Sequence, residues 1–173
     1  MANKICISVI GANNPTEDDA KMAREVGREI AKRGATLICG GLNGVMLESA
    51  KGAKDVGGIT VGILPGDEPD IANPFIDIPI ATGLGHARNV IVAYSGNAVI
   101  AVGGKLGTLS EIVFALLKEK PVIGINTWHL EKGRTYGNDI IPAKSAKEAV
   151  NKAFDLIINR KNETFSDPSS GEA

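Results

Sequence analysis

Short runs of apolar residues, each free of charged side chains, recur along this chain. They lack the alternation of polar and apolar positions seen in half-exposed strands, which is typical of strands buried on both faces of a parallel sheet. Segments of helical character separate the runs, so strands and helices alternate. The pattern predicts an α/β fold, a Rossmann-like, doubly wound parallel sheet in three αβα layers, with strands near residues 5–10, 36–39, 60–64, 98–102 and 121–125.

Capping signals mark where the intervening helices begin and end. Thr16 precedes three acidic residues, as expected at a helix N-terminus, and Gly34 is a suitable C-cap. Ser145 and Glu148 fit a capping box that opens a closing helix, which the apolar spacing carries to about residue 157. Further helices are expected over residues 45–55, 86–94 and 108–118.

The remaining segments set the expected limits of the domain. The run at 75–80 contains Pro79, which cannot donate to a strand ladder, so this run is at most an edge strand. The run at 121–125 is expected to be the last strand. Residues 1–160 are expected to form one domain, and the polar tail at 161–173 is expected to be disordered.

Charge and hydropathy argue against several classes of partner. The net charge is −1 and no basic run is present, so nucleic-acid binding is not expected. No apolar stretch approaches the ~20 residues that span a bilayer, and residues 1–4 lead into a strand rather than a signal peptide, so a cytoplasmic protein without membrane contact is expected. Cys6 and Cys39 fit reduced core residues, and no residue cluster predicts a metal site.

Two glycine loops lie at the carboxyl ends of predicted strands, at residues 40–44 and 103–108. Ligands of open α/β sheets bind beyond that edge, and each loop leads into a helix N-terminus, which favours a phosphate. The alternative is that these glycines merely turn a strand into a helix. Neither loop matches a Walker or a dinucleotide-binding motif. The candidate ligand-binding residues are Gly41, Gly44, Gly103, Gly104, Lys105, Gly107 and Thr108.

Arg88 and Glu111 are the charged residues with the strongest case for a role in the site. Glu111 lies early in an otherwise apolar helix, where it could complement the helix dipole, pair with an arginine, or act on the ligand as an acid or base. Arg88 could pair with Glu111 or bind a phosphate with both arms of its guanidinium. His86 fits a loop anchor better than a catalyst.

Four segments together resemble the molybdenum cofactor carrier protein-like family, which is related to the LONELY GUY phosphoribohydrolases, proteins often mislabelled as lysine decarboxylases. The likeness covers residues 4–157. It implies a Rossmann-like fold, a phosphate site built from the glycine loops, and a homo-oligomer, either a dimer or a tetramer. It rests on Gly40-Gly41-Leu42-Asn43-Gly44-Val45-Met46, Gly62-Ile63-Leu64-Pro65-Gly66, Thr82-Gly83-Leu84-Gly85-His86-Ala87-Arg88-Asn89 and Gly107-Thr108-Leu109-Ser110-Glu111.

The resemblance leaves two main functions open. One is a binding protein for a phosphorylated pterin, such as the molybdenum cofactor, or for a nucleotide-like ligand, with no cofactor required. The other is a hydrolase that releases a free base and ribose 5-phosphate, in which Arg88 and Glu111 match the catalytic residues. Lys105 and Asn89 depart from the hydrolase motifs, which have glycine and lysine there, and this favours the carrier-like branch. A nucleotide sensor or a purely structural oligomer is a third reading. Lysine decarboxylation is rejected, since nothing resembles a pyridoxal-phosphate site.

Overall fold

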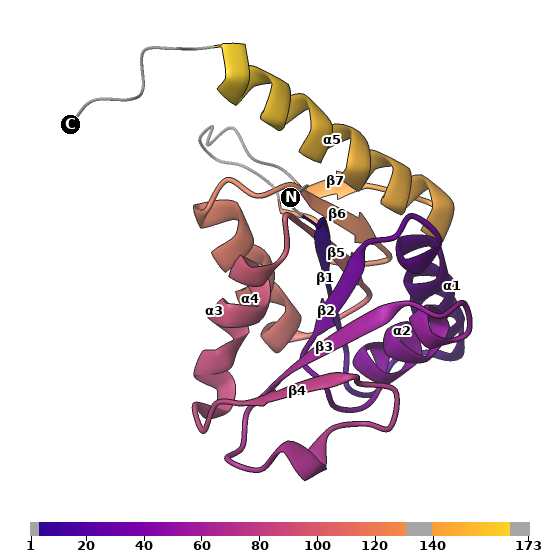
Figure 1. The fold of residues 1–173 in the computed structure, drawn as a ribbon, viewed down its shortest axis with the longest axis vertical. Helices are drawn as coiled ribbons and strands as arrows, with labels where there is room; N and C mark the ends of the chain where they lie inside the picture. The colour runs from indigo at the N-terminus through magenta and orange to yellow at the C-terminus, as the bar shows by residue number, and fades with distance from the viewer. Residues whose placement is uncertain (1–3, 131–139, 167–173) are drawn as a thin grey trace, which may run out of the picture.

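A single parallel sheet of seven strands forms the centre of the protein (Figure 1). The structure is a computed structural model that describes residues 4–130 and 140–166. The strand order across the sheet is β4-β3-β2-β1-β5-β6-β7. Every adjacent pair is parallel, which confirms the predicted fold class. The strands are β1 (Cys6–Gly11), β2 (Thr36–Cys39), β3 (Ile59–Leu64), β4 (Ile78–Ala81), β5 (Ala98–Val102), β6 (Val122–Ile125) and β7 (Ile140–Pro142).

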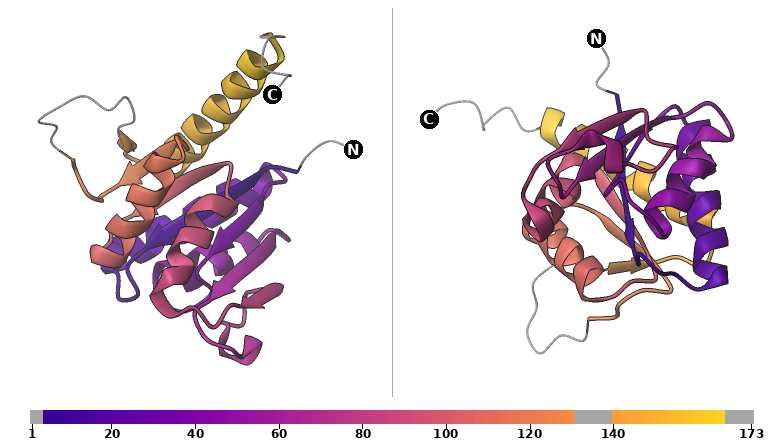
Figure 2. Two further views of the ribbon diagram at one scale, coloured as in Figure 1. Left: turned by 90° about the vertical axis from the view of Figure 1, so that its left-hand side faces the viewer. Right: turned by 90° about the horizontal axis from the view of Figure 1, so that it is seen from below.

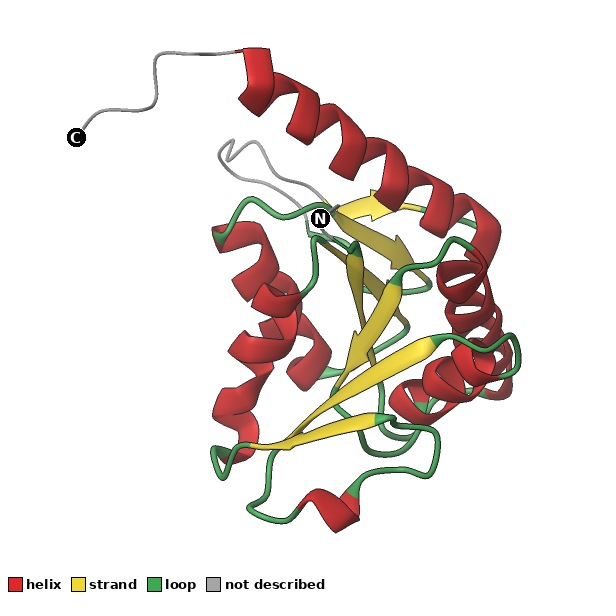
Figure 3. Cartoon of the chain, viewed as in Figure 1, coloured by secondary structure: helices red, strands yellow, loops and turns green. Residues whose placement is uncertain are grey.

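Helices cover both faces of the sheet and complete the three predicted layers (Figure 3). One face carries α1 (Glu17–Lys32), α2 (Val45–Lys54) and α5 (Ala146–Ser166), and the other carries α3 (Asn89–Ser95) and α4 (Leu106–Leu117). Two short 3₁₀ turns, η1 (Pro69–Ile71) and η2 (Gly85–Arg88), precede β4 and α3. Thr16 caps α1 as predicted, since its Oγ1 accepts a hydrogen bond from the Asp19 amide at 3.1 Å.

The central strands are apolar throughout because both of their faces are buried. In β1, Ile7 and Val9 belong to the apolar core under α1, α2 and α5, whereas Ile10 belongs to the core under α3 and α4. Ser8 also faces the second layer, where its hydroxyl donates to the Val92 carbonyl of α3 at 2.6 Å. The missing alternation in the sequence therefore reflects two cores on either side of one sheet.

The sequence predicted the strand at one edge of the sheet, β4, but not the strand at the other edge, β7. Pro79 lies in β4 at one edge, as predicted, although the strand begins only at Ile78. The expectation that residues 121–125 form the last strand is wrong, because β7 follows and pairs with β6 at the opposite edge. That strand has only three residues, Ile140, Ile141 and Pro142, which is too short for a periodicity to be recognised.

The last helix is longer than predicted. The predicted domain boundary at residue 160 falls inside α5, which continues to Ser166. The disorder expected over residues 161–173 stays a prediction. Proline disfavours a helical conformation in the residue before it. No proline interrupts the sequence from Ala146 until Pro168, so nothing of this kind ends α5 before Ser166. Residues 167–173 lie outside the described residues. In Figure 2 the end of α5 projects beyond the sheet.

The order of the strands identifies where a ligand site would lie. From β1 the chain moves outward through β2, β3 and β4, and it then returns to place β5 on the other side of β1. The connection that leaves β1 runs through α1 over one face of the sheet, and the connection that leaves β5 runs through α4 over the other. A crevice therefore opens at the carboxyl ends of β1 and β5. Gly11 and Val102 are paired at that point. Within the described residues, no helix is both long and apolar enough to cross a membrane.

Candidate functional site

A cavity of about 230 Å³ lies at the carboxyl ends of β1 and β5. Four segments that are distant in sequence contribute to it: the end of β1 with the loop that follows, the segment between β2 and α2, the turn η2 with the start of α3, and the first two turns of α4. The lining residues are Val9, Ile10, Gly11, Ala12, Asn13, Gly40, Met46, His86, Arg88, Asn89, Lys105, Gly107, Thr108 and Glu111.

Arg88 and Glu111 come together in this cavity. Both side chains are buried, at 9% and 8% exposed, and Arg88 Nη1 lies 3.5 Å from Glu111 Oε1. Burial raises the pKa of Glu111 to about 8, although the positive charge of Arg88 acts in the opposite direction. Burial also lowers the pKa of Arg88, and the charge of Glu111 opposes that shift. The cavity therefore contains a carboxyl group that can exchange a proton near neutral pH.

The Arg88 guanidinium has few partners for a buried cation. Its one hydrogen bond of ordinary length runs from Nη1 to Asn89 Oδ1, at 2.9 Å. Its Nη2 is 3.5 Å from the Gly40 carbonyl and 4.0 Å from Met46 Sδ, and its Nε has no partner among the described residues. A guanidinium has five N–H donors, and buried cations normally have their donors satisfied, so Arg88 retains unused capacity to bind an anion.

The N-terminus of α4 is the second feature of the cavity that suits an anion. Lys105 is the N-cap residue, and its side chain makes no capping hydrogen bond. The first amides of a helix have no partner within it, and Gly107 and Thr108 of this first turn line the cavity. A Cβ at Gly107 would meet nothing nearer than Asn89 Nδ2 at 4.0 Å, so this glycine leaves open space beside the amides. Such a helix end binds phosphate well.

The rest of the second glycine loop shapes the backbone ahead of α4. Gly103 and Gly104 have positive φ angles of 55° and 115° and do not line the cavity. The segment after β6 holds this loop, since the Thr127 hydroxyl donates to the Gly103 carbonyl and Trp128 Nε1 donates to the Lys105 carbonyl at 3.2 Å. Trp128 therefore anchors the loop.

Gly40 of the first glycine loop lines the cavity, whereas Gly41 and Gly44 are closely packed. Gly41 has a φ of 75°, and a Cβ there would lie 2.7 Å from Leu64 and 3.1 Å from Gly62. Gly44 has a φ of 67°, and a Cβ there would lie 2.3 Å from the carbonyl oxygens of Ala12 and Asn13. Neither Gly41 nor Gly44 lines the cavity, so the predicted role of these two residues in ligand binding stays a prediction.

A known protein family matches nearly the whole described part of the chain. The family model described as the SLOG cluster4 family matches residues 4–159. The chain belongs to the SLOG cluster4 family. The match spans almost all of the described residues and includes every segment that lines the cavity.

Relatives of this SLOG cluster4 chain include both kinds of protein suggested by the sequence. The structure of the molybdenum cofactor binding protein from Rippkaea orientalis has a TM-score of 0.83 and 36% identity, over 91% of this chain and 99% of that chain. The molybdenum cofactor carrier protein of Chlamydomonas reinhardtii has a TM-score of 0.78 and 36% identity, over 90% and 99%. The cytokinin riboside 5′-monophosphate phosphoribohydrolase of Mycobacterium tuberculosis is 31% identical over 146 residues, 78% of each chain. The predicted resemblance is confirmed.

The sequence interpretation missed part of the site of this SLOG cluster4 member. It found Arg88, Lys105, Gly107, Thr108 and Glu111, all of which line the cavity. It missed the loop after β1 because that loop, unlike the other two, is not glycine-rich. The available signal was the central position of β1, since the strand at the reversal of a doubly wound sheet always borders the crevice. The missed residues include Gly11, Ala12, Asn13, Gly40, Met46 and Asn89.

Proposed function

We propose that this chain binds a phosphorylated small molecule, with the phosphate between the Arg88 guanidinium and the first turn of α4. The observation that carries this proposal is the buried Arg88 guanidinium, whose Nε has no partner in the described part of the chain, on the wall of a cavity that also receives a helix N-terminus without a side-chain cap from its N-cap residue. Both groups favour a negative charge.

The remaining lining suits a flat organic group attached to the phosphate. Val9, Ile10 and Met46 supply an apolar wall, and Asn13 and His86 supply polar groups that could orient a ring. Ligand pockets commonly combine such surfaces. The likeness to molybdenum cofactor binding proteins, over nearly their whole length, supports a phosphorylated pterin or a nucleotide-like ligand. Among the described residues, no group of three or more His, Cys, Asp or Glu side chains could hold a metal ion.

Glu111 favours a second candidate function, hydrolysis of a nucleoside 5′-monophosphate. In this reaction water replaces the base at the N-glycosidic bond, so the products are the free base and ribose 5-phosphate. Glu111 would exchange the proton or stabilise the cationic sugar, and Arg88 would bind the 5′-phosphate. The burial of Glu111 in the cavity and its raised pKa support this role, as does the likeness to the mycobacterial phosphoribohydrolase.

One experiment tests binding and separates the two functions. The protein is titrated with AMP, GMP and a molybdopterin preparation by calorimetry, and release of base from the nucleotides is followed by chromatography. The binding function predicts saturable binding without turnover. The hydrolase predicts turnover that falls about 10²-fold or more in Glu111→Gln. Absence of binding and of turnover with every phosphorylated compound would overturn both.

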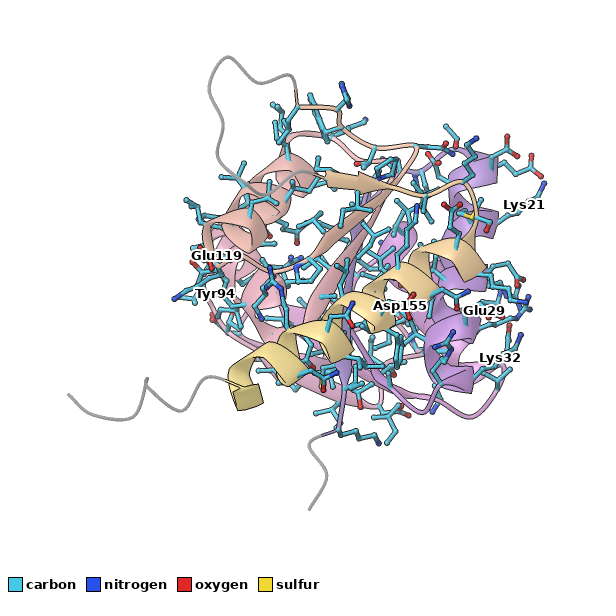
Figure 4. All side chains as sticks on the ribbon, turned by 90° about the horizontal axis from the view of Figure 1, so that it is seen from above. Lys21, Glu29, Lys32, Tyr94, Glu119 and Asp155 are labelled. Carbon is cyan, nitrogen blue, oxygen red and sulfur yellow. The ribbon has the colours of Figure 1, made fainter. Side chains whose placement is uncertain are left out.

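We also propose that a second copy of the chain covers the outer face of α3 and α4. The only charged residue of α4 is the buried Glu111, whereas Leu106, Val113 and Leu117 are exposed on its outside, at 74%, 42% and 71%. By contrast, Lys21, Glu29 and Lys32 project outward from α1 (Figure 4). A helix that is apolar all round requires cover, and a two-fold axis would pair this face with itself.

Light scattering tests the proposed pairing. The wild type should have the mass of a dimer or tetramer, and Leu117→Lys should shift it toward the monomer because it places a charge in the apolar contact. The matched control is Ile158→Lys on α5, where the isoleucine is 49% exposed on the opposite layer, and the mass should not change. A monomeric wild type would contradict the pairing.

A further inference from the structure

Asn89 occupies the gap between the two groups that the proposed function assigns to the phosphate. It is the first residue of α3, directly after Arg88, and it is only 7% exposed. It also lines the cavity beside Gly107, since its Nδ2 is the nearest atom to the position of a Gly107 Cβ. We infer that Asn89 is a positioning residue that holds the Arg88 guanidinium at a fixed place relative to the first turn of α4. This inference rests on the proposed function.

The inference stands on a continuous chain of three hydrogen bonds. Arg88 Nη1 donates to Asn89 Oδ1 at 2.9 Å, and Asn89 Nδ2 donates to Ser110 Oγ at 3.1 Å. The Ser110 hydroxyl then donates to the Gly107 carbonyl at 2.6 Å. These hydrogen bonds therefore connect the Arg88 guanidinium to the backbone of the first turn of α4, whose amides would bind the phosphate. We call these three bonds the Asn89 relay.

The direction of each bond explains why an amide side chain suits this position. The guanidinium only donates, so it needs an acceptor. The Ser110 hydroxyl already gives its proton to Gly107, so it needs a donor. An amide provides an acceptor and a donor on two separate atoms at the end of a short side chain, whereas an ionised carboxylate provides no donor.

The Asn89 relay also affects the contact between Arg88 and Glu111. Nη1 lies 2.9 Å from Asn89 but 3.5 Å from Glu111, so the amide holds this nitrogen more closely than the carboxyl group does. Without the amide, the guanidinium would be free to close on Glu111 as an ion pair. That pair would use the donors that the ligand phosphate requires, so Asn89 keeps Arg88 available to the ligand.

Ser110 offers the sharpest test because it does not line the cavity. The variants are Asn89→Ala, Ser110→Ala and Ser110→Thr, which keeps a hydroxyl. The matched control is Ser95→Ala, which removes another helical serine hydroxyl that donates to a backbone carbonyl, that of Ile91, and has no link to the cavity. Two readouts are used: the guanidinium ¹⁵N signals of Arg88 in the ligand-free protein, and calorimetric titration with inorganic phosphate and with AMP.

The Asn89 relay predicts separate Arg88 Nη1 and Nη2 signals in the wild type, and averaged signals in Asn89→Ala and Ser110→Ala. Affinity should fall about tenfold in Asn89→Ala and about threefold in Ser110→Ala, whereas Ser110→Thr and Ser95→Ala should match the wild type. Unchanged Arg88 signals and affinity in Ser110→Ala would overturn the inference. A wild type that binds neither phosphate nor AMP, but whose Arg88 signals respond as expected, would overturn the role of the relay in phosphate binding and leave only a structural link.

Discussion

The two glycine loops look alike in the sequence, but the structure uses them differently. Both follow a parallel strand and both lead into a helix. At the first loop, Gly41 and Gly44 have positive φ angles and lie against neighbouring backbone, so no side chain fits. At the second loop, Gly107 has open space beside it and lines the cavity. Gly41 and Gly44 thus serve close packing, whereas Gly107 leaves open space at the cavity.

The position of each loop in the sheet explains the difference. The first loop follows β2, which lies between β1 and β3, and the connections on both sides of β2 run over the face that carries α1 and α2. The second loop follows β5, which borders β1 where the strand order reverses and a crevice opens. The two loops therefore have different surroundings although their residue patterns are alike, and of the first loop only Gly40 lines the cavity.

Gly44→Ala should have the largest effect, because it tests the packing of the first loop. The new Cβ would lie 2.3 Å from two backbone carbonyl oxygens at a φ of 67°, and neither can move without distorting the chain. We expect the free energy of unfolding in urea to fall by roughly 3 kcal/mol or more. The matched control is Gly34→Ala, at a φ of 72° but with nothing within 4 Å, which should lose only about 1 kcal/mol. Equal losses in the two variants would show that the first loop is not closely packed.

Arg88→Ala should abolish most of the ligand affinity at the second loop. It removes the buried cation that the phosphate would contact, and we expect the dissociation constant for AMP to rise about 100-fold in calorimetry. The fold should survive, since Glu111 can remain protonated once its partner is gone. A small change, within about twofold, would remove Arg88 from the site and would weaken the distinction between the loops.

Glu111→Gln should change how the stability of the protein depends on pH. In the unfolded chain this carboxyl group ionises near pH 4.5, whereas burial raises its pKa to about 8 in the fold. Between those values the folded state binds a proton that the unfolded state lacks, so the wild type loses stability as pH rises toward 8. Glutamine does not titrate, so the variant should gain roughly 2 kcal/mol on the wild type between pH 6 and 8 in urea unfolding. Parallel profiles would show that Glu111 is ionised in the fold.

Gly107→Ala is the converse of the Gly44 substitution and should have the smallest effect. Nothing packs against this position, and alanine is the better helix former, so the unfolding free energy should stay the same or rise by up to about 1 kcal/mol. The added methyl group would nevertheless narrow the space beside the helix amides. We therefore expect the affinity for AMP to fall about tenfold in the same titrations. A loss of stability instead would mean that Gly107, like Gly44, serves packing.

The sequence was sufficient for the layers of the fold and for five of the fourteen residues that line the cavity. Nearly continuous apolar runs such as Ile5–Ile10 predicted buried parallel strands, because burial on both faces removes most polar positions. Arg88 and Glu111 were found because charged residues in apolar surroundings are conspicuous. The strand β7 and the packing role of Gly41 could not be predicted, since the first is too short for a pattern and the second depends on contacts with Gly62, 21 residues away.

The most direct test of the central claim is a titration of the ¹⁵N-labelled protein with AMP, followed by the backbone amide signals of both loops. The account predicts that the signals of Gly107 and Thr108 shift most, with saturation, and that those of Gly41 and Gly44 shift little, because the first two residues line the cavity and the last two do not. Large shifts at Gly41 and Gly44 without shifts at Gly107 and Thr108 would contradict it.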